Sequence, residues 1–74
     1  MNKIRRKKLG DAFELISQAK DILEAVKEEE QEAIDNLPDN FRFGERGEEM
    51  QGYIEMLDEA YNYLDDANSV IEQI

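Results

Sequence analysis

The apolar residues of this chain recur in alternating steps of three and four, the spacing that places side chains along one stripe of a helix. In the first half of the chain the stripe is broken only at Glu30, and it consists of Leu9, Ala12, Ile16, Ala19, Leu23, Val26, Ala33 and Leu37. In the second half it is unbroken and consists of Met50, Tyr53, Leu57, Ala60, Leu64, Ala67, Ile71 and Ile74. The pattern predicts two long amphipathic helices that pack along these two stripes.

The residues between the two stripes favour a turn. Pro38 disfavours the α conformation at the residue before it, and Gly44 follows a Pro-Asp-Asn sequence that is typical of turns. We therefore expect a single all-α domain, an antiparallel helical hairpin with helices over about 3–37 and 46–74 and a turn over 38–44.

The start of the first helix has two readings. Asn2 can cap a helix that runs unbroken through the basic residues, or Gly10, Asp11 and Glu14 can form a capping box that leaves residues 1–8 as a loose arm. The good helix propensity of Lys, Arg and Leu offsets the cost of about 1 kcal/mol at Gly10, so the unbroken helix is favoured.

Pairing the two stripes about the turn fixes what lies at each end of the hairpin. Leu9 is expected beside Ile74, so residues 1–8 project past the open end without a partner on the second helix. Phe41 and Phe43 are expected to cover the apolar residues at the closed end.

Glu30 interrupts the first stripe, and the same pairing sets it beside Tyr53. A carboxylate at this position needs either a partner, which Tyr53, Arg42 or Arg46 can supply, or partial contact with water. We interpret Glu30 as a polar residue that sets the register, with a ligand site as the alternative.

Apolar residues also lie beside the stripes, where the second helix of a hairpin cannot cover them. These residues are Leu15, Ile22, Met56, Tyr63 and Val70. A chain of 74 residues without cysteine needs support beyond its own small core. We therefore expect these residues to form an oligomer interface, with a homodimer that closes into a four-helix bundle as the simplest assembly.

Charge is unevenly distributed along the chain. The sequence has 19 acidic and 9 basic residues and a net charge of −10, yet five of the nine basic residues precede Asp11, the first acidic one. An acidic body repels nucleic acid and anionic lipid and attracts basic protein surfaces. No apolar run is long enough to span a membrane and none has the form of a signal peptide, so a cytoplasmic location is expected.

Two binding functions follow from this distribution, and the sequence leaves both open. In the first, an acidic face engages a basic protein surface in place of nucleic acid. That face consists of Glu14, Asp21, Glu24, Glu28, Glu32, Asp35, Glu55, Asp58, Glu59, Asp65 and Asp66. In the second, a cationic tip binds the phosphates of nucleotides or nucleic acid. That tip consists of Lys3, Arg5, Arg6, Lys7 and Lys8.

Catalytic chemistry has few candidate residues in this sequence. Histidine and cysteine are absent, and no serine has a basic residue beside it that would activate it. The spacing of Glu28 and Glu32 with Glu55 and Asp58 is similar to the magnesium-binding carboxylates of all-α nucleoside triphosphate pyrophosphatases. On the heptad pattern these four point away from the seam, so we predict no catalytic residues, no metal and no cofactor, with a pyrophosphatase as the remote alternative.

Several short segments carry a resemblance to known proteins. Asp35-Asn36-Leu37-Pro38, then Gly44-Glu45-Arg46-Gly47, then a Leu- and Ala-rich acidic helix, resemble small acidic helical-hairpin proteins encoded in phages and mobile elements of Gram-positive bacteria. The resemblance brings no activity and no site residues. It implies a context in which small acidic proteins often inhibit host defence proteins.

Overall fold

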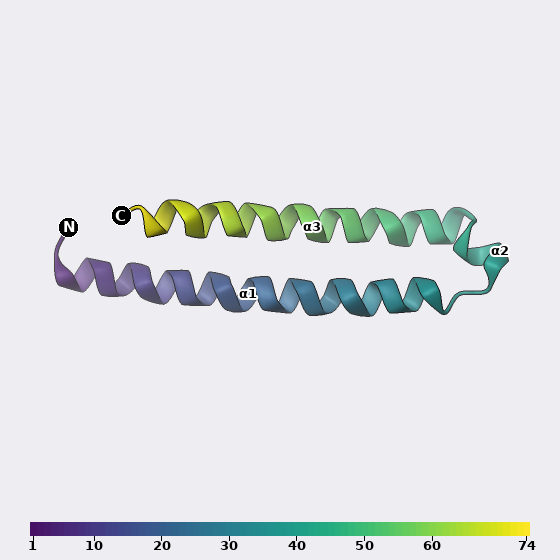
Figure 1. Cartoon of the computed structure of the whole chain (residues 1–74), viewed down its shortest axis with the longest axis horizontal. Helices are drawn as coiled ribbons and strands as arrows, with labels where there is room; N and C mark the ends of the chain where they lie inside the picture. The colour runs from purple at the N-terminus through teal and green to yellow at the C-terminus, as the bar shows by residue number, and fades with distance from the viewer.

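A computed structural model describes all 74 residues and shows an all-helical chain with two long helices. Helix α1 spans Lys3–Asp35, the short helix α2 spans Asp39–Arg42, and helix α3 spans Glu45–Glu72. Helices α1 and α3 lie side by side in opposite directions, with α2 at one end and both termini at the other (Figure 1). The molecule is a rod with extents of 59 × 15 × 11 Å.

Helix α1 begins and ends where its flanking residues supply a start and a stop. The side chain of Asn2 accepts a hydrogen bond from the backbone N–H of Arg5 at 2.9 Å, so the unbroken helix is the form observed. The helix ends at Asp35 because Pro38 forces Leu37 out of the α conformation. It is two residues shorter than the sequence predicted.

The connection contains a single helical turn that the sequence analysis did not predict. Pro38 is the N-cap of α2, and its carbonyl accepts hydrogen bonds from the N–H groups of Phe41 and Arg42, each at 2.9 Å. Gly44 is extended and caps α3, with Glu45 and Glu48 in the first turn near the positive end of the helix dipole.

Gly47 is the point where the connection crosses α3. A Cβ placed on Gly47 would lie 1.9 Å from the backbone oxygen of Arg42 and 3.0 Å from that of Phe41. Because both contacts are to backbone atoms, no side-chain movement relieves them. The backbone of α2 can therefore pass this close to α3 only over a glycine.

The contact line between the two long helices does not run along the centre of the predicted apolar stripes. It is shifted to one edge of each stripe. The side-chain amide of Asn68 donates to the carbonyl of Phe13, and the ammonium of Lys20 lies over the ring of Tyr61. Seven-residue spacing extends this contact line along both helices to Lys27, Ile34, Gly47 and Ile54, which are half-buried or buried. Of the sixteen residues in the two predicted stripes, four are exposed, namely Val26, Ala33, Tyr53 and Ile74. The apolar stripe is wider than one neighbouring helix can cover, so the helices rotate toward one edge of it.

The longitudinal register agrees with the predicted pairing. Leu9 and Ile74 line one surface groove, and Glu30 and Tyr53 line another near the turn. Phe41 and Phe43 were expected to cover the closed end, and this prediction is wrong. Phe43 is 74% exposed and Phe41 is 50% exposed, so neither ring is enclosed at the closed end.

Very little of the chain is shielded from water. Four of the 74 residues are buried, and the two apolar ones are Ile34 and Ile54. Asn68 is buried between the helices, where its amide donates to the carbonyl of Phe13 and to the hydroxyl of Ser17, each at 3.2 Å. The contact line is thus partly polar, and its apolar core is small.

Replacing Gly47 by alanine is expected to lower the free energy of unfolding by about 1–3 kcal/mol, the usual cost of forcing extra volume into a tight contact. Gly10→Ala and Gly52→Ala are matched controls, since a Cβ at either meets nothing within 4 Å. Each control should raise stability by roughly 0.5–1 kcal/mol through helix propensity. Urea denaturation followed by circular dichroism at equal chain concentration measures all three. A neutral or stabilising effect of Gly47→Ala would show that the close crossing is absent.

Candidate functional site

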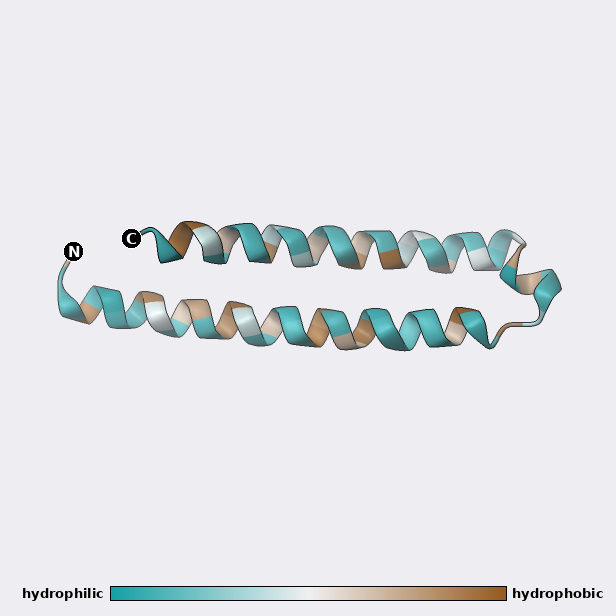
Figure 2. Cartoon of the chain, in the orientation of Figure 1, coloured by the Kyte–Doolittle hydropathy of each residue, from teal (hydrophilic) through white to brown (hydrophobic).

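The exposed apolar residues of α1 and α3 gather on one side of the hairpin, which we call the apolar face. It consists of Leu15, Ile22, Val26, Tyr53, Met56, Tyr63, Val70 and Ile74, all of which are exposed. Figure 2 shows hydrophobic segments recurring along both long helices between hydrophilic ones. All five residues predicted as an oligomer interface belong to this face, and Met56 and Tyr63 are 64% and 66% exposed.

Heptad geometry explains why both helices contribute to the same face. On α1, Leu15 and Ile22 lie counterclockwise of the contact line when viewed from the N-terminus. On α3, Met56 and Tyr63 also lie counterclockwise of the contact line when α3 is viewed from its own N-terminus. Since the two helices run in opposite directions, these two displacements point to the same side of the rod.

The opposite side carries most of the carboxylates predicted to bind a partner, and we call it the acidic face. Two ion pairs between the helices mark it, Lys20 to Asp65 at 2.6 Å and Lys27 to Asp58 at 2.7 Å. Glu14, Asp21, Glu24, Glu28, Asp35 and Glu55 lie on the same side, and Glu32, Glu59 and Asp66 lie on the outer edges. The structure therefore brings the predicted acidic residues together, although Asp58 and Asp65 are already paired.

The two lysines on the acidic face sit within a largely negative surface. Hydrogen bonding to Asp65 raises the pKa of Lys20, and hydrogen bonding to Asp58 raises the pKa of Lys27, in each case against partial desolvation. The ammonium of Lys20 also lies 5.0 Å from the centre of the Tyr61 ring. These pairs join the helices, and the carboxylates around them keep the face negative.

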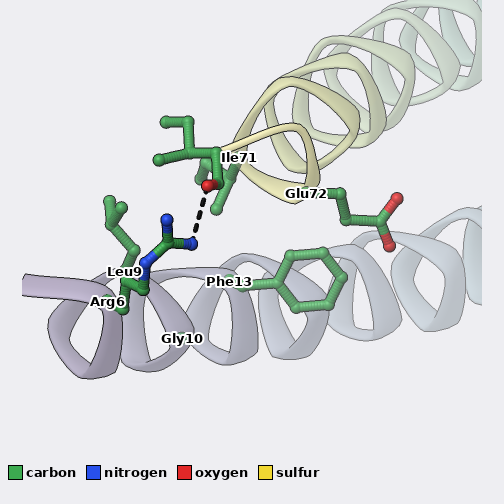
Figure 3. Close-up of a pocket in the computed structure, with 7 residues that line it drawn as sticks. Arg6, Leu9, Gly10, Phe13, Ile71 and Glu72 are labelled. Carbon is green, nitrogen blue, oxygen red and sulfur yellow. Dashed lines mark hydrogen bonds between the residues drawn. The ribbon is translucent and has the colours of Figure 1, made fainter. Parts of the chain in front are cut away.

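The cationic tip is the first two turns of α1, and its five basic side chains are exposed. Arg6 is the exception to the prediction that residues 1–8 have no partner. Its guanidinium donates a 2.8 Å hydrogen bond to the carbonyl oxygen of Ile74 at the end of α3 (Figure 3). This bond caps the C-terminal end of α3, and Lys3, Arg5, Lys7 and Lys8 take part in no ion pair within the chain.

Glu30 is half-buried near the turn, and its predicted partners are engaged elsewhere. The hydroxyl of Tyr53 donates to Glu49 at 2.8 Å, and Arg42 pairs with Asp39 at 3.2 Å. Arg46 lines the same shallow groove as Glu30 without a hydrogen bond or ion pair to it. Neither Tyr53 nor Arg42 therefore pairs with Glu30, and the Glu30 side chain remains partly in contact with water.

The carboxylates do not converge anywhere on the molecule. No three acidic side chains lie close enough together to hold a metal ion, and this includes the magnesium-like spacing around Glu28 and Glu55. The grooves found on the surface are open and shallow, and Figure 3 shows one between Leu9 and Phe13 of α1 and Ile71 of α3. Neither long helix has an apolar stretch sufficient to cross a bilayer. Flat surfaces are thus the features available for binding.

Comparison with known proteins adds no relative. No family model, no curated protein and no solved structure matches the chain at a significant level. Any function therefore has to be inferred from the surfaces described above.

Two tyrosines at the edge of the apolar face provide a spectroscopic test of this geometry. Hydrogen bonds to Glu49 and Glu59 raise the pKa of Tyr53 and Tyr63 above 10.0. A raised pKa means that these contacts stabilise the folded chain below pH 10 and that the contribution is lost as the pH rises further. In a Tyr61→Phe background, Glu49→Gln and Glu59→Gln should each lower the midpoint of one phenol, measured by absorbance near 295 nm. Unchanged midpoints would place the two hydroxyls in water.

Proposed function

We propose that the chain is a non-enzymatic protein-interaction module that dimerises through its apolar face and binds a basic surface of another protein through its acidic face. The observation that carries this proposal is the division of one thin rod into an apolar side and an acidic side. The apolar side is the part that a second copy covers, and the acidic side is the part that remains in water. The assembly is then a four-helix bundle with carboxylates on two outer surfaces.

The amount of exposed surface supports self-association. The chain exposes 5776 Å², whereas a compact monomer of its mass exposes about 4,700 Å². Its radius of gyration is 17.1 Å, against about 11 Å for a compact domain of this length. The excess of about 1,100 Å² per chain is comparable to the roughly 800 Å² that each partner buries in a stable protein interface.

The rotation of the apolar stripes supports a bundle of four helices in particular. On each long helix the predicted stripe is displaced from the contact line by one heptad position, which is about 51°. Both displacements turn toward the apolar face. In a four-helix bundle of square cross-section, consider two directions from one helix, one toward an adjacent helix and one toward the centre of the bundle. The angle between these two directions is roughly 45°. Because these two angles are similar, each apolar stripe faces the position that would be the centre of a bundle formed with a second hairpin.

The charge of the outer surface supports a basic partner. Glu14, Asp21, Glu28 and Asp35 follow one another at seven-residue spacing along the acidic face. Regularly spaced carboxylates on a rigid rod resemble the phosphates of a nucleic acid in charge and linear arrangement, so a protein that binds nucleic acid presents a complementary surface. The resemblance to proteins of phages and mobile elements makes a host defence protein one candidate for the partner.

The cationic tip supports an alternative function, the sequestration of nucleotides or nucleic acid. The observation in its favour is that all five basic side chains are exposed and none takes part in an ion pair within the chain. Replacing Arg5, Arg6, Lys7 and Lys8 by glutamine should then abolish binding of a labelled oligonucleotide and leave helicity intact. Unchanged oligonucleotide binding by that variant would remove the alternative.

A polar substitution on the apolar face is expected to dissociate the dimer. Ile22→Gln affects both copies, and at about 1.5–3 kcal/mol for each buried side chain the dissociation constant should rise roughly 100-fold or more. Ala25→Gln is the control, because Ala25 is exposed on the outer edge of α1, away from the apolar face. Sedimentation equilibrium over a range of concentrations measures both variants. A wild-type chain that remains monomeric at high micromolar concentration would contradict self-association.

Neutralising the acidic face is expected to abolish capture of basic proteins. The variant carries Glu14→Gln, Asp21→Asn and Glu28→Gln, and it is compared with wild type as an affinity matrix for a lysate of the cell that encodes the chain. Proteins retained by wild type alone should be basic, should be displaced by added DNA, and should elute as salt rises to 1 M, since the screening length then falls to about 3 Å. Retention that is equal on both matrices or insensitive to salt would contradict the acidic face as the binding surface.

A further inference from the structure

The two ends of the rod carry exposed apolar side chains that the apolar face does not include. Met1 and Ile4 are exposed at the cationic tip, and Phe41 and Phe43 are exposed at the turn. Figure 1 shows that these two groups lie at opposite ends of the molecule. Each end therefore has unpartnered apolar surface of its own.

The same two ends carry opposite charge. The tip holds five basic residues before the first acidic one. The turn end is acidic on the side of the apolar face, where Glu29 of α1 and Glu49 of α3 occupy the heptad positions of Ile22 and Met56. Two hairpins laid in the same direction would place tip against tip and turn against turn. Two hairpins laid in opposite directions would place each tip against an acidic turn end.

The position of the apolar face along the rod agrees with the second arrangement. Its large side chains extend from Ile74, which lies beside Leu9, to Tyr53, which lies beside Glu30. The middle of the face is thus close to Ala19 on α1. A two-fold axis at that level, perpendicular to the rod, sets residues 3–8 of one copy across roughly residues 30–35 of the other. The tip then overlaps the acidic end fully.

We propose that the second copy binds in this antiparallel, tip-to-turn orientation. Arg5 and Lys8 share heptad positions with Ala12 and Leu15 at the edge of the apolar face, so they are the tip cations that face the partner's acidic end. Met1, at the heptad position of Lys8 and Leu15, then meets the exposed rings at the partner's turn. This inference rests on the dimer of the proposed function. It also separates the two cationic tips, which the alternative function would need to bring together.

Distances between spin labels distinguish the two orientations. The chain has no cysteine, so Lys3→Cys and Asp39→Cys each create a unique labelling site. In the antiparallel dimer two labels at position 3 should be about 50 Å apart, at 1.5 Å of helix rise per residue. A one-to-one mixture of the two labelled chains should add a distance of about 20 Å, two helix spacings. Both are measured by double electron–electron resonance.

The possible outcomes separate this inference from the function on which it rests. A distance near 20 Å between labels at position 3 would show a parallel dimer, which overturns the orientation and leaves self-association standing. A signal without any intermolecular distance would show that the dimer itself is absent. The long distance, together with the short one in the mixture, is the result expected.

Charge reversal gives an independent measurement of the same contact. Arg5→Glu with Lys8→Glu should raise the dimer dissociation constant by roughly tenfold or more, since attraction across the contact becomes repulsion. Lys3→Glu with Lys7→Glu makes the same change in net charge on the side of α1 that faces away from the partner, and it should have a much smaller effect. Adding Glu29→Lys and Glu49→Lys, at the heptad positions of Ile22 and Met56, to the first variant should restore the dimer. Equal weakening by both pairs, or failure of the restoration, would contradict the tip-to-turn contact.

Discussion

Two parallel rods touch along a single line, and this geometric limit determines the rest of the structure. A helix whose apolar stripe is wider than that line can cover only part of it with one neighbour. In this chain the contact between α1 and α3 buries Ile34 and Ile54 and leaves Met56 and Tyr63 in water. The hairpin therefore buries few of its apolar side chains and leaves many of them exposed to water.

The residues on the contact line are unusually polar for the main contact between the two long helices. Lys20 and Lys27 form ion pairs across it, and Asn68 bonds to the backbone of Phe13. A buried amide nitrogen that donates to one particular carbonyl favours a single register, because a shift of one helix along the other would break that bond. We infer that the contact line specifies how the two helices align, whereas the apolar face supplies the larger area for burial.

The sequence predicted the elements well and their contacts less well. Three-and-four spacing located both long helices, and Pro38 located the end of the first, because these features act through the local backbone. Helix α2 was missed because a segment of four residues is too short to show apolar residues recurring every three or four positions. The role of Gly47 was missed because it depends on the approach of a distant backbone oxygen, that of Arg42. The position of Asn68 could have been recognised from the sequence. It lies seven residues after Tyr61 and fourteen after Ile54, so the three residues share one heptad position and one side of the helix.

The sequence predicted which residues share a surface, but it did not predict which side of each helix faces the other helix. Heptad positions show that Leu15 and Ile22 share one side of α1 and that Glu14 and Asp21 share another, but they do not show which side faces α3. That choice depends on pair contacts such as Lys20 with Asp65, which the sequence of either helix alone does not contain. The prediction therefore took the centre of each apolar stripe as the contact line, and the structure places the contact at one edge of it.

The opposition of the two faces has a consequence for how a dimer would present its charge. Because the acidic face lies opposite the apolar face, pairing through the apolar face does not hide carboxylates such as Glu14 and Glu28. It sets two identical acidic surfaces back to back, facing in opposite directions. Such a particle can hold two separate basic partners at once, whereas one compact partner cannot contact both surfaces and gains no avidity from the second. A partner that is itself oligomeric, or a long flexible basic segment that wraps around the bundle, is the kind of target for which dimerisation would increase affinity.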